Sequence, residues 1–124
     1  MAELVIAEII ALARRLTDRS REMHEGRWRK TAPSCYEVRG KTLGIVGYGH
    51  IGTQVGILGE AVGMQVLFHD VAAKLPIGNN RPADSLDALL AQSDFVTLHV
   101  PETPLTRGLV GERELARLEA ERAA

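Results

Sequence analysis

The chain has 124 residues, which is enough for one domain or part of one. Hydrophobic residues make up 45%, charged residues 25%, and the formal net charge is −1, so a general attraction to nucleic acid or to anionic membranes is excluded. The single cysteine, Cys35, excludes an internal disulfide, and no apolar stretch is long enough to span a membrane. We therefore expect a cytoplasmic protein with neither nucleic-acid nor membrane partners.

The first predicted element is one long helix over residues 3–25, which Gly26 ends. Its first half is apolar almost all round, and a helix of that kind is buried on more than one side. Its apolar side chains are Leu4, Val5, Ile6, Ile9, Ile10, Leu12, Ala13 and Leu16. Because nothing in the sequence precedes this leading helix (1–26), we expect it to contact a partner, either in a homo-oligomer or on a full-length subunit.

Residues 14–41 are basic, with nine Lys or Arg against four Asp or Glu. A solvated face is the plainer interpretation, and a contact with an acidic partner surface or a phosphorylated ligand is the alternative. Within this stretch, residues 26–40 form a predicted connecting loop that Trp28 anchors by packing.

The central motif begins with a short apolar strand over residues 42–46. Gly47, Gly49 and Gly52 then form a G-x-G-x-x-G sequence, and the predicted helix that follows ends at Gly63. In a dinucleotide-binding turn the first glycine allows the tight bend and the second lets a pyrophosphate approach the backbone. The third lets the helix pack closely on the sheet.

Two further features favour a dinucleotide over a glycine turn that serves packing alone. His50 and Ile51 stand at the predicted helix start, where free N–H groups and the helix dipole attract phosphate. Asp70 follows a second strand over residues 65–69, 18 residues after Gly52, and an acid there accepts hydrogen bonds from ribose hydroxyls.

Asp70 also predicts NAD rather than NADP, because a carboxylate repels the 2′-phosphate of NADP. Residues 71–73 offer no arginine to hold that phosphate, and we interpret Lys74 as a solvated loop residue.

The rest of the chain predicts an irregular segment over residues 71–82 and a short helix over 86–92 capped by Ser85. A third strand over 95–100 follows, and residues 112–124 have helical composition. The fold class is therefore α/β: a partial Rossmann-type NAD-binding domain, in which a βαβαβ half follows a long helix.

A half-fold of this kind is expected to leave one strand of the sheet without a neighbour. If the second neighbour of strand 42–46 comes from an absent half, that strand has an open apolar edge. We therefore expect the chain to be a fragment or to fold against something else.

Four stretches together resemble the NAD-binding domain of D-isomer-specific 2-hydroxyacid dehydrogenases: GYGHIGTQVGILGEAVGM, FHD, AAKLPIGN and LHVPETPLTRGLVG. The KLPIGN segment is most similar to the bacterial-type 3-phosphoglycerate dehydrogenase branch of this family. The resemblance implies NAD-dependent oxidation of 3-phosphoglycerate to 3-phosphohydroxypyruvate, in serine biosynthesis. It implies cofactor contacts from Gly47, Gly49, His50, Ile51, Gly52, Asp70, His99, Val100, Pro101 and Thr106, with His99 acting mainly through its backbone.

The resemblance implies no catalytic residue in this chain, because the catalytic arginine, glutamate and histidine of the family lie beyond its last residue. We also expect no metal site, because His50 and His69 lack ligand spacing with other His, Cys or Asp residues. The substrate domain of the family is absent. We therefore expect residues 1–124 to form a partial NAD-binding domain, with the dinucleotide-binding half over 41–124, which is inactive alone. Two alternatives stay open: a non-catalytic NAD-binding or interaction module, and a fragment of another 2-hydroxyacid dehydrogenase.

Overall fold

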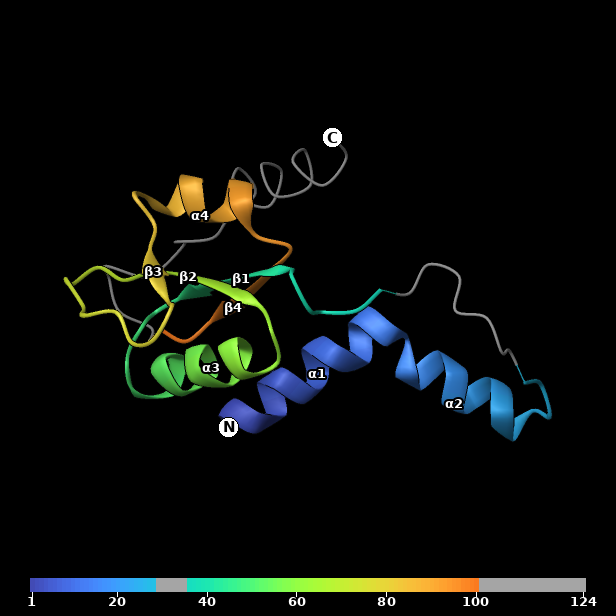
Figure 1. Ribbon diagram of the computed structural model, residues 1–124. Coiled ribbons are helices and arrows are strands. Elements are labelled where there is room, and N and C mark those ends of the chain that lie inside the picture. Colours follow the sequence, from blue (N-terminus) through green and yellow to red (C-terminus); the bar gives the residue numbers. More distant parts are fainter. Residues whose placement is uncertain (29–35, 101–124) are drawn as a thin grey trace.

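The computed structural model describes residues 1–28 and 36–100 (Figure 1). In chain order its elements are α1 (Ala2–Arg14), α2 (Leu16–His24), β1 (Thr42–Val46), α3 (His50–Ala61), β2 (Gln65–His69), β3 (Arg81–Pro82), α4 (Leu86–Gln92) and β4 (Phe95–Leu98). None of the helices in these ranges is long and apolar enough to cross a membrane.

The four described strands form one parallel sheet in the order β3-β2-β1-β4. Ile45 of β1 is level with Phe68 of β2 on one side and with Thr97 of β4 on the other. Strand β1 is therefore central, and the open edge predicted for residues 42–46 was wrong. At the start of this pairing the Asp94 carboxylate accepts a hydrogen bond from the Thr42 amide over 2.8 Å.

The error has a physical cause in the segment after β2. Residues 81–82 form β3, a strand too short to give a period-two pattern, and Pro82 argues against a strand in sequence. Proline is tolerated there because β3 lies at the edge of the sheet. With β3 in the third position, the strand that begins at Phe95 is the fourth and crosses to the other side of β1.

Helices cover both faces of the sheet (Figure 1). Helices α1 and α3 lie on one face and α4 on the other, as expected for a doubly wound fold. Alternation along the strands supplies the two cores. Leu43, Ile45, Val66 and Phe68 pack toward α1 and α3, whereas Val46 and Leu67 pack toward α4.

The residues at two helix ends agree with the sequence analysis. The Ser85 hydroxyl accepts a hydrogen bond from the Ala88 amide at the start of α4, over 3.0 Å. Gly63 follows α3 with a φ of 89°, a backbone conformation that favours glycine.

The predicted single helix over residues 3–25 was wrong, because Arg15 breaks it with a φ of 52°. The break follows the change in the sequence. The part of α1 that contacts the sheet and α3 is apolar, whereas α2 is mostly polar and points away from the body (Figure 1). At the end of α1, the Ala13 carbonyl accepts a hydrogen bond from the amide of Tyr36, where the described chain returns to the body.

Helix α1 buries one face within this chain. Ala2, Ile6, Ile9 and Ala13 are buried, whereas the exposed fractions of Leu4 and Leu12 are 56% and 73%. The expected burial on more than one side is therefore not met by the described residues.

The arginines around α2 pair with nearby acids, which agrees with the solvated interpretation of the basic stretch. Arg19 pairs with Glu22 over 3.0 Å, Arg21 pairs with Asp18 over 3.6 Å, and Arg27 pairs with Glu25. The prediction that Trp28 anchors the loop by packing was wrong, because its side chain is 75% exposed.

Candidate functional site

The carboxyl ends of β1, β2 and β4 meet at one edge of the sheet, and the glycine motif lies there. The chain passes from β1 to β2 and β3 on one side and then crosses back to place β4 on the other side of β1. In open α/β sheets, ligands bind in the crevice outside the strand ends at such a point of reversal. Gly47 follows β1 at this crevice, and His99 follows β4.

Two of the three motif glycines are required by contacts within the protein. Gly47 has a φ of 99°, and a Cβ on it would lie 2.7 Å from Val100 Cγ1 and closer still to the His99 carbonyl. A Cβ on Gly52 would meet the Gly47 carbonyl oxygen. Gly49 differs, because no described atom lies within 4 Å of where its Cβ would stand. This open space fits a pyrophosphate approaching the backbone.

The start of α3 offers backbone donors to the same space. Gly49 precedes the helix, its N-cap position makes no side-chain cap hydrogen bond, and no acid lies in the first turn. The first N–H groups of a helix have no acceptor within it, so His50 and Ile51 present theirs outward. These donors and the helix dipole favour an anion.

Asp70 ends β2 with its carboxylate fixed from two sides. Its Oδ2 accepts a hydrogen bond from the Tyr48 amide, and its Oδ1 accepts one from the Ala72 amide, each over 2.9 Å. Each carboxylate oxygen has lone-pair capacity for a second donor, such as a ribose hydroxyl. The acid is therefore held beside the glycine turn and can still bind a ligand.

A cavity of about 200 Å³ lies beside Asp70. Its lining includes Ala72, Ala73 and Lys74, all of which are exposed. Lys74 is therefore solvated, as the sequence predicts, and it also borders the cavity.

His99 and Val100 form the opposite wall of the crevice. The His99 amide donates to the Val46 carbonyl over 2.8 Å, and its ring Nε2 shares a 2.8 Å hydrogen bond with Thr97 Oγ1. Burial lowers the pKa of the His99 imidazole below 6.5, which favours the neutral ring. The His99 ring is thus held within the protein by Thr97, and contact with the cofactor through the His99 backbone stays a prediction.

The structure brings most of the predicted residues together. A cavity of about 450 Å³ is lined by Gly49, His50, Ile51, His99 and Val100, which come from both sides of the crevice. Gly47 lies against His99 and Val100, Gly52 lies against the Gly47 carbonyl, and Asp70 follows the neighbouring strand β2. The predicted residues Pro101 and Thr106 lie outside the described residues.

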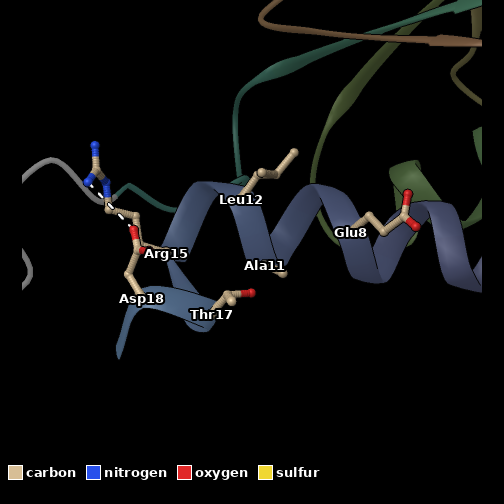
Figure 2. Close-up of a pocket in the computed structure, with 6 residues that line it drawn as sticks. All are labelled: Glu8, Ala11, Leu12, Arg15, Thr17 and Asp18. Atoms are coloured by element: carbon tan, nitrogen blue, oxygen red, sulfur yellow. Dashed lines mark ion pairs between the residues drawn. The ribbon is translucent and has the colours of Figure 1, made fainter. Parts of the chain in front are cut away.

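A larger cavity, of about 590 Å³, lies at the bend between α1 and α2 (Figure 2). Its lining residues are Glu8, Ala11, Leu12, Arg15, Thr17 and Asp18. Figure 2 shows the Arg15–Asp18 pair at one end and Glu8 at the other, and the paired groups, 3.8 Å apart, are each about half exposed. The charged groups of this groove include an exposed Arg15–Asp18 pair, whereas the glycine turn, the start of α3 and the carboxylate of Asp70 meet at the strand ends. We therefore place the candidate site at the strand ends despite the smaller volumes.

Two contributors were missed in the sequence. Tyr48 is one of the variable positions within the glycine motif, and Asn80 lay in a segment predicted as irregular. The Asn80 side-chain amide donates to the Tyr48 hydroxyl over 2.8 Å, and both residues are buried. Their partnership joins residues 32 apart, so no local pattern indicates it. In the described ranges, no three His, Cys, Asp or Glu side chains cluster as metal ligands would.

The parallel sheet, the crevice at its point of reversal and the open glycine turn define the chain as a doubly wound dinucleotide-binding protein. The family model of the D-isomer specific 2-hydroxyacid dehydrogenase, NAD binding domain, matches residues 6–123. The chain belongs to this family, and the cofactor of its domain is NAD.

Individual relatives agree with this assignment. The chain is 56% identical over 115 residues to a D-3-phosphoglycerate dehydrogenase of Dictyostelium discoideum, covering 93% of this chain and 28% of that protein. It is 49% identical over 116 residues to a D-3-phosphoglycerate dehydrogenase of Escherichia coli K12, covering 94% of this chain and 28% of that protein. The chain thus spans just over a quarter of the length of these two relatives.

Among solved structures, D-lactate dehydrogenase of Aquifex aeolicus, complexed with NAD and lactic acid, superposes with a TM-score of 0.86. It is 32% identical, and the match covers 94% of this chain and 36% of that one.

Proposed function

We propose that this chain is the NAD-binding part of a 3-phosphoglycerate dehydrogenase, which oxidises 3-phosphoglycerate to 3-phosphohydroxypyruvate. The observation that carries the proposal is the identity of 56% and 49% to two enzymes of that name across nearly all of this chain. The alternative of another 2-hydroxyacid dehydrogenase is less favoured, because identity to the D-lactate enzyme is 32%.

The residues at the strand ends would hold the cofactor in two halves. The amides of His50 and Ile51 would bind the pyrophosphate, which reaches the backbone through the open space at Gly49. Asp70 would accept hydrogen bonds from the adenosine ribose, and its charge would disfavour NADP. His99 and Val100 would close the other wall, with Pro101 and Thr106 following them. Bound NAD would supply the hydride acceptor of the oxidation.

We assign no catalytic residue to this chain. A general base must lie within hydrogen-bond reach of the substrate hydroxyl. His99, at the crevice wall, already engages Thr97 through its ring nitrogen over 2.8 Å. The chain would therefore bind and orient the cofactor, while the groups that act on the substrate would come from elsewhere in the enzyme.

The surface of α1 supports a contact with another subunit, preferably a second copy of this chain. Leu4 and Leu12 are exposed on the helix whose other face packs on α3 and the sheet. Covering them would bury apolar area that otherwise faces water. Sedimentation of the wild type and of the L12E variant tests this: we expect a dimer that L12E dissociates, and a monomeric wild type would contradict it. With one cysteine and no disulfide possible within the chain, a cytoplasmic location is the one we propose.

Calorimetric titration with NAD, with NADP as the control and circular dichroism on the same sample, tests the cofactor half of the proposal. We expect saturable NAD binding and weaker NADP binding by a folded chain. A folded chain that binds neither would contradict the proposal. The substrate half is tested on the protein isolated from its own cells. There, NADH formation should follow 3-phosphoglycerate addition and should not follow D-lactate addition.

A further inference from the structure

The segment from Asp70 to Asn80 forms one wall of the cavity beside Asp70, which it borders through Ala72, Ala73 and Lys74. The side chains between its two ends are exposed and contribute little to packing against the rest of the protein. Residues 71–79 are all exposed, and the segment lies between β2 and β3. Its position is fixed from its two ends. At the far end, the Asn79 amide donates to Glu60 Oε2 of α3 over 3.2 Å, and Asn80 is buried with an exposed fraction of 3%.

The hydroxyl of Tyr48 is the main anchor of that far end. Tyr48 is 2% exposed and its ring stacks on Phe68, with the ring centroids 3.8 Å apart. Its oxygen accepts hydrogen bonds from the Ile77 amide over 3.2 Å and from the Asn80 side-chain amide over 2.8 Å. A phenol oxygen from the glycine turn therefore satisfies two groups of the wall.

The near end depends on the same residue. The Tyr48 main-chain amide donates to Asp70 Oδ2, and Asp70 Oδ1 accepts from the Ala72 amide. Tyr48 thus holds both the acid that begins the wall and the asparagine that ends it. Ala72, Ala73 and Lys74, which border the cavity, lie between these two anchors.

The side chain of Asn80 fits into its buried position because α3 has a glycine opposite it. A Cβ on Gly56 of α3 would meet Asn80 Nδ2, so only glycine leaves this space. Asn80 Oδ1 is buried and has no hydrogen-bond partner among the described residues, which costs free energy. The buried contact between Asn80 and Tyr48 therefore carries a free-energy cost of desolvation, which an asparagine in an exposed turn would not incur.

We propose that Tyr48 is a positioning residue for the adenosine half of NAD. This inference rests on the proposed cofactor site. The backbone of Tyr48 belongs to the turn that faces the pyrophosphate, and its hydroxyl fixes the wall beside Asp70. A dinucleotide spans both places, so the Tyr48 hydroxyl sets their relative position before the cofactor arrives.

The variant Tyr48→Phe isolates this role, because it keeps the ring stack on Phe68 and the main-chain bond to Asp70. The matched control is Ser93→Ala, which also removes a buried hydroxyl. Ser93 Oγ donates to the Leu89 carbonyl over 2.6 Å at the end of α4, beside Gly44 of β1 and away from the cavity. Comparable losses of thermal stability are expected from the two variants.

Two measurements on the full chain separate positioning from stability. In hydrogen exchange without NAD, Tyr48→Phe should accelerate exchange at the amides of Ile77 and Asn79, and Ser93→Ala should not. In calorimetry, Tyr48→Phe should raise the Kd for NAD by roughly five- to tenfold, as the loss of buried hydrogen bonds allows. Ser93→Ala should leave the Kd unchanged.

A double-mutant cycle tests whether the effect of Tyr48→Phe depends on its hydrogen-bond partner Asn80. If the Tyr48–Asn80 bond carries the effect, Tyr48→Phe combined with Asn80→Ala should weaken NAD binding no more than the stronger single variant.

Each outcome decides the proposal. Unchanged exchange at Ile77 and Asn79 in Tyr48→Phe would overturn it, as would faster exchange with an unchanged Kd for NAD. If Tyr48→Phe accelerates exchange at these amides but the wild type binds no NAD, the proposed function is contradicted, and with it a positioning role toward NAD. If the wild type binds NAD and Ser93→Ala weakens binding as much as Tyr48→Phe, the effect is one of stability and the proposal fails.

Discussion

The crevice at the sheet edge and the arm formed by residues 15–28 differ in the kind of contact that stabilises them. At the crevice, hydrogen bonds join residues far apart in sequence, such as Asp70 to Tyr48 and Asn80 to Tyr48, and the groups are buried or half-buried. On the arm, ion pairs join residues two or three positions apart, and most of the side chains are exposed. Substitutions should therefore have large effects at the crevice and small effects on the arm.

The largest effect is expected from Gly52→Ala, because a Cβ there would meet the Gly47 carbonyl oxygen. Moving α3 away from the sheet to make room should lower the free energy of unfolding by about 3 kcal/mol. Urea denaturation followed by circular dichroism measures this loss. An unchanged midpoint and slope would show that the helix does not need this close approach.

Gly49→Ala should act on binding and not on the fold, because no described atom lies near its Cβ position. A methyl group there would obstruct the phosphate and weaken charged hydrogen bonds of about 1.5–3 kcal/mol each, so NAD affinity should fall by about tenfold or more. Calorimetry gives the affinity and the same urea titration gives the stability. Loss of stability with unchanged affinity would mean that this glycine serves packing.

Asp70→Ala should weaken NAD binding by about tenfold, since hydrogen bonds to the ribose from a charged group are lost. It should weaken NADP binding less, because the repulsion of the 2′-phosphate also disappears. The control is Asp84→Ala, which removes the same charge from an exposed position outside the cavity lining. Equal affinities of the variant and wild type for both cofactors would show that Asp70 is not the ribose ligand.

Acid should destabilise the crevice through His99. Burial lowers the pKa of the folded imidazole below 6.5, so the unfolded chain binds the proton first as the pH falls. The stability gained from neutral His99 is therefore present above about pH 6.5 and is lost as the pH falls toward the lowered pKa. We expect the difference in Tm between neutral and mildly acidic buffer to shrink in His99→Asn and to persist in His24→Asn. An equal difference in all three proteins would contradict this.

The smallest effect is expected on the arm. Arg21 and Asp18 pair over 3.6 Å with side chains that are 67% and 43% exposed. Such pairs contribute about 0–1 kcal/mol, so Arg21→Ala should change stability by about 0.5 kcal/mol or less and leave NAD affinity unchanged. A loss as large as that of Gly52→Ala would show that the arm belongs to the same cooperative unit as the crevice.

The sequence predicts the elements of the crevice well because their cues are local. Strands 42–46 and 65–69, the Ser85 cap and the glycine motif each depend on residues within a few positions of one another, and the structure has all of them.

The features missed depend on contacts between distant residues. The two-residue strand at Arg81–Pro82 exists because β2 is beside it, and it moves Phe95–Leu98 to the other side of β1. The break at Arg15 lies between the apolar α1 and the mostly polar α2, and neither a glycine nor a proline marks it in the sequence. The Tyr48–Asn80 contact joins the turn after β1 to the segment before β3, 32 residues apart in sequence. That the site residues named from the sequence bind NAD stays a prediction.

An NMR titration of the labelled chain with NAD tests the central claim most directly, because it compares the two regions in one experiment. The account predicts saturable shifts at the amides of Gly49, His50 and Ile51, with none at Thr17 or Asp18 on the larger groove of the arm. Shifts centred on the α1–α2 groove, or none in a folded chain, would contradict a cofactor site at the carboxyl ends of the strands.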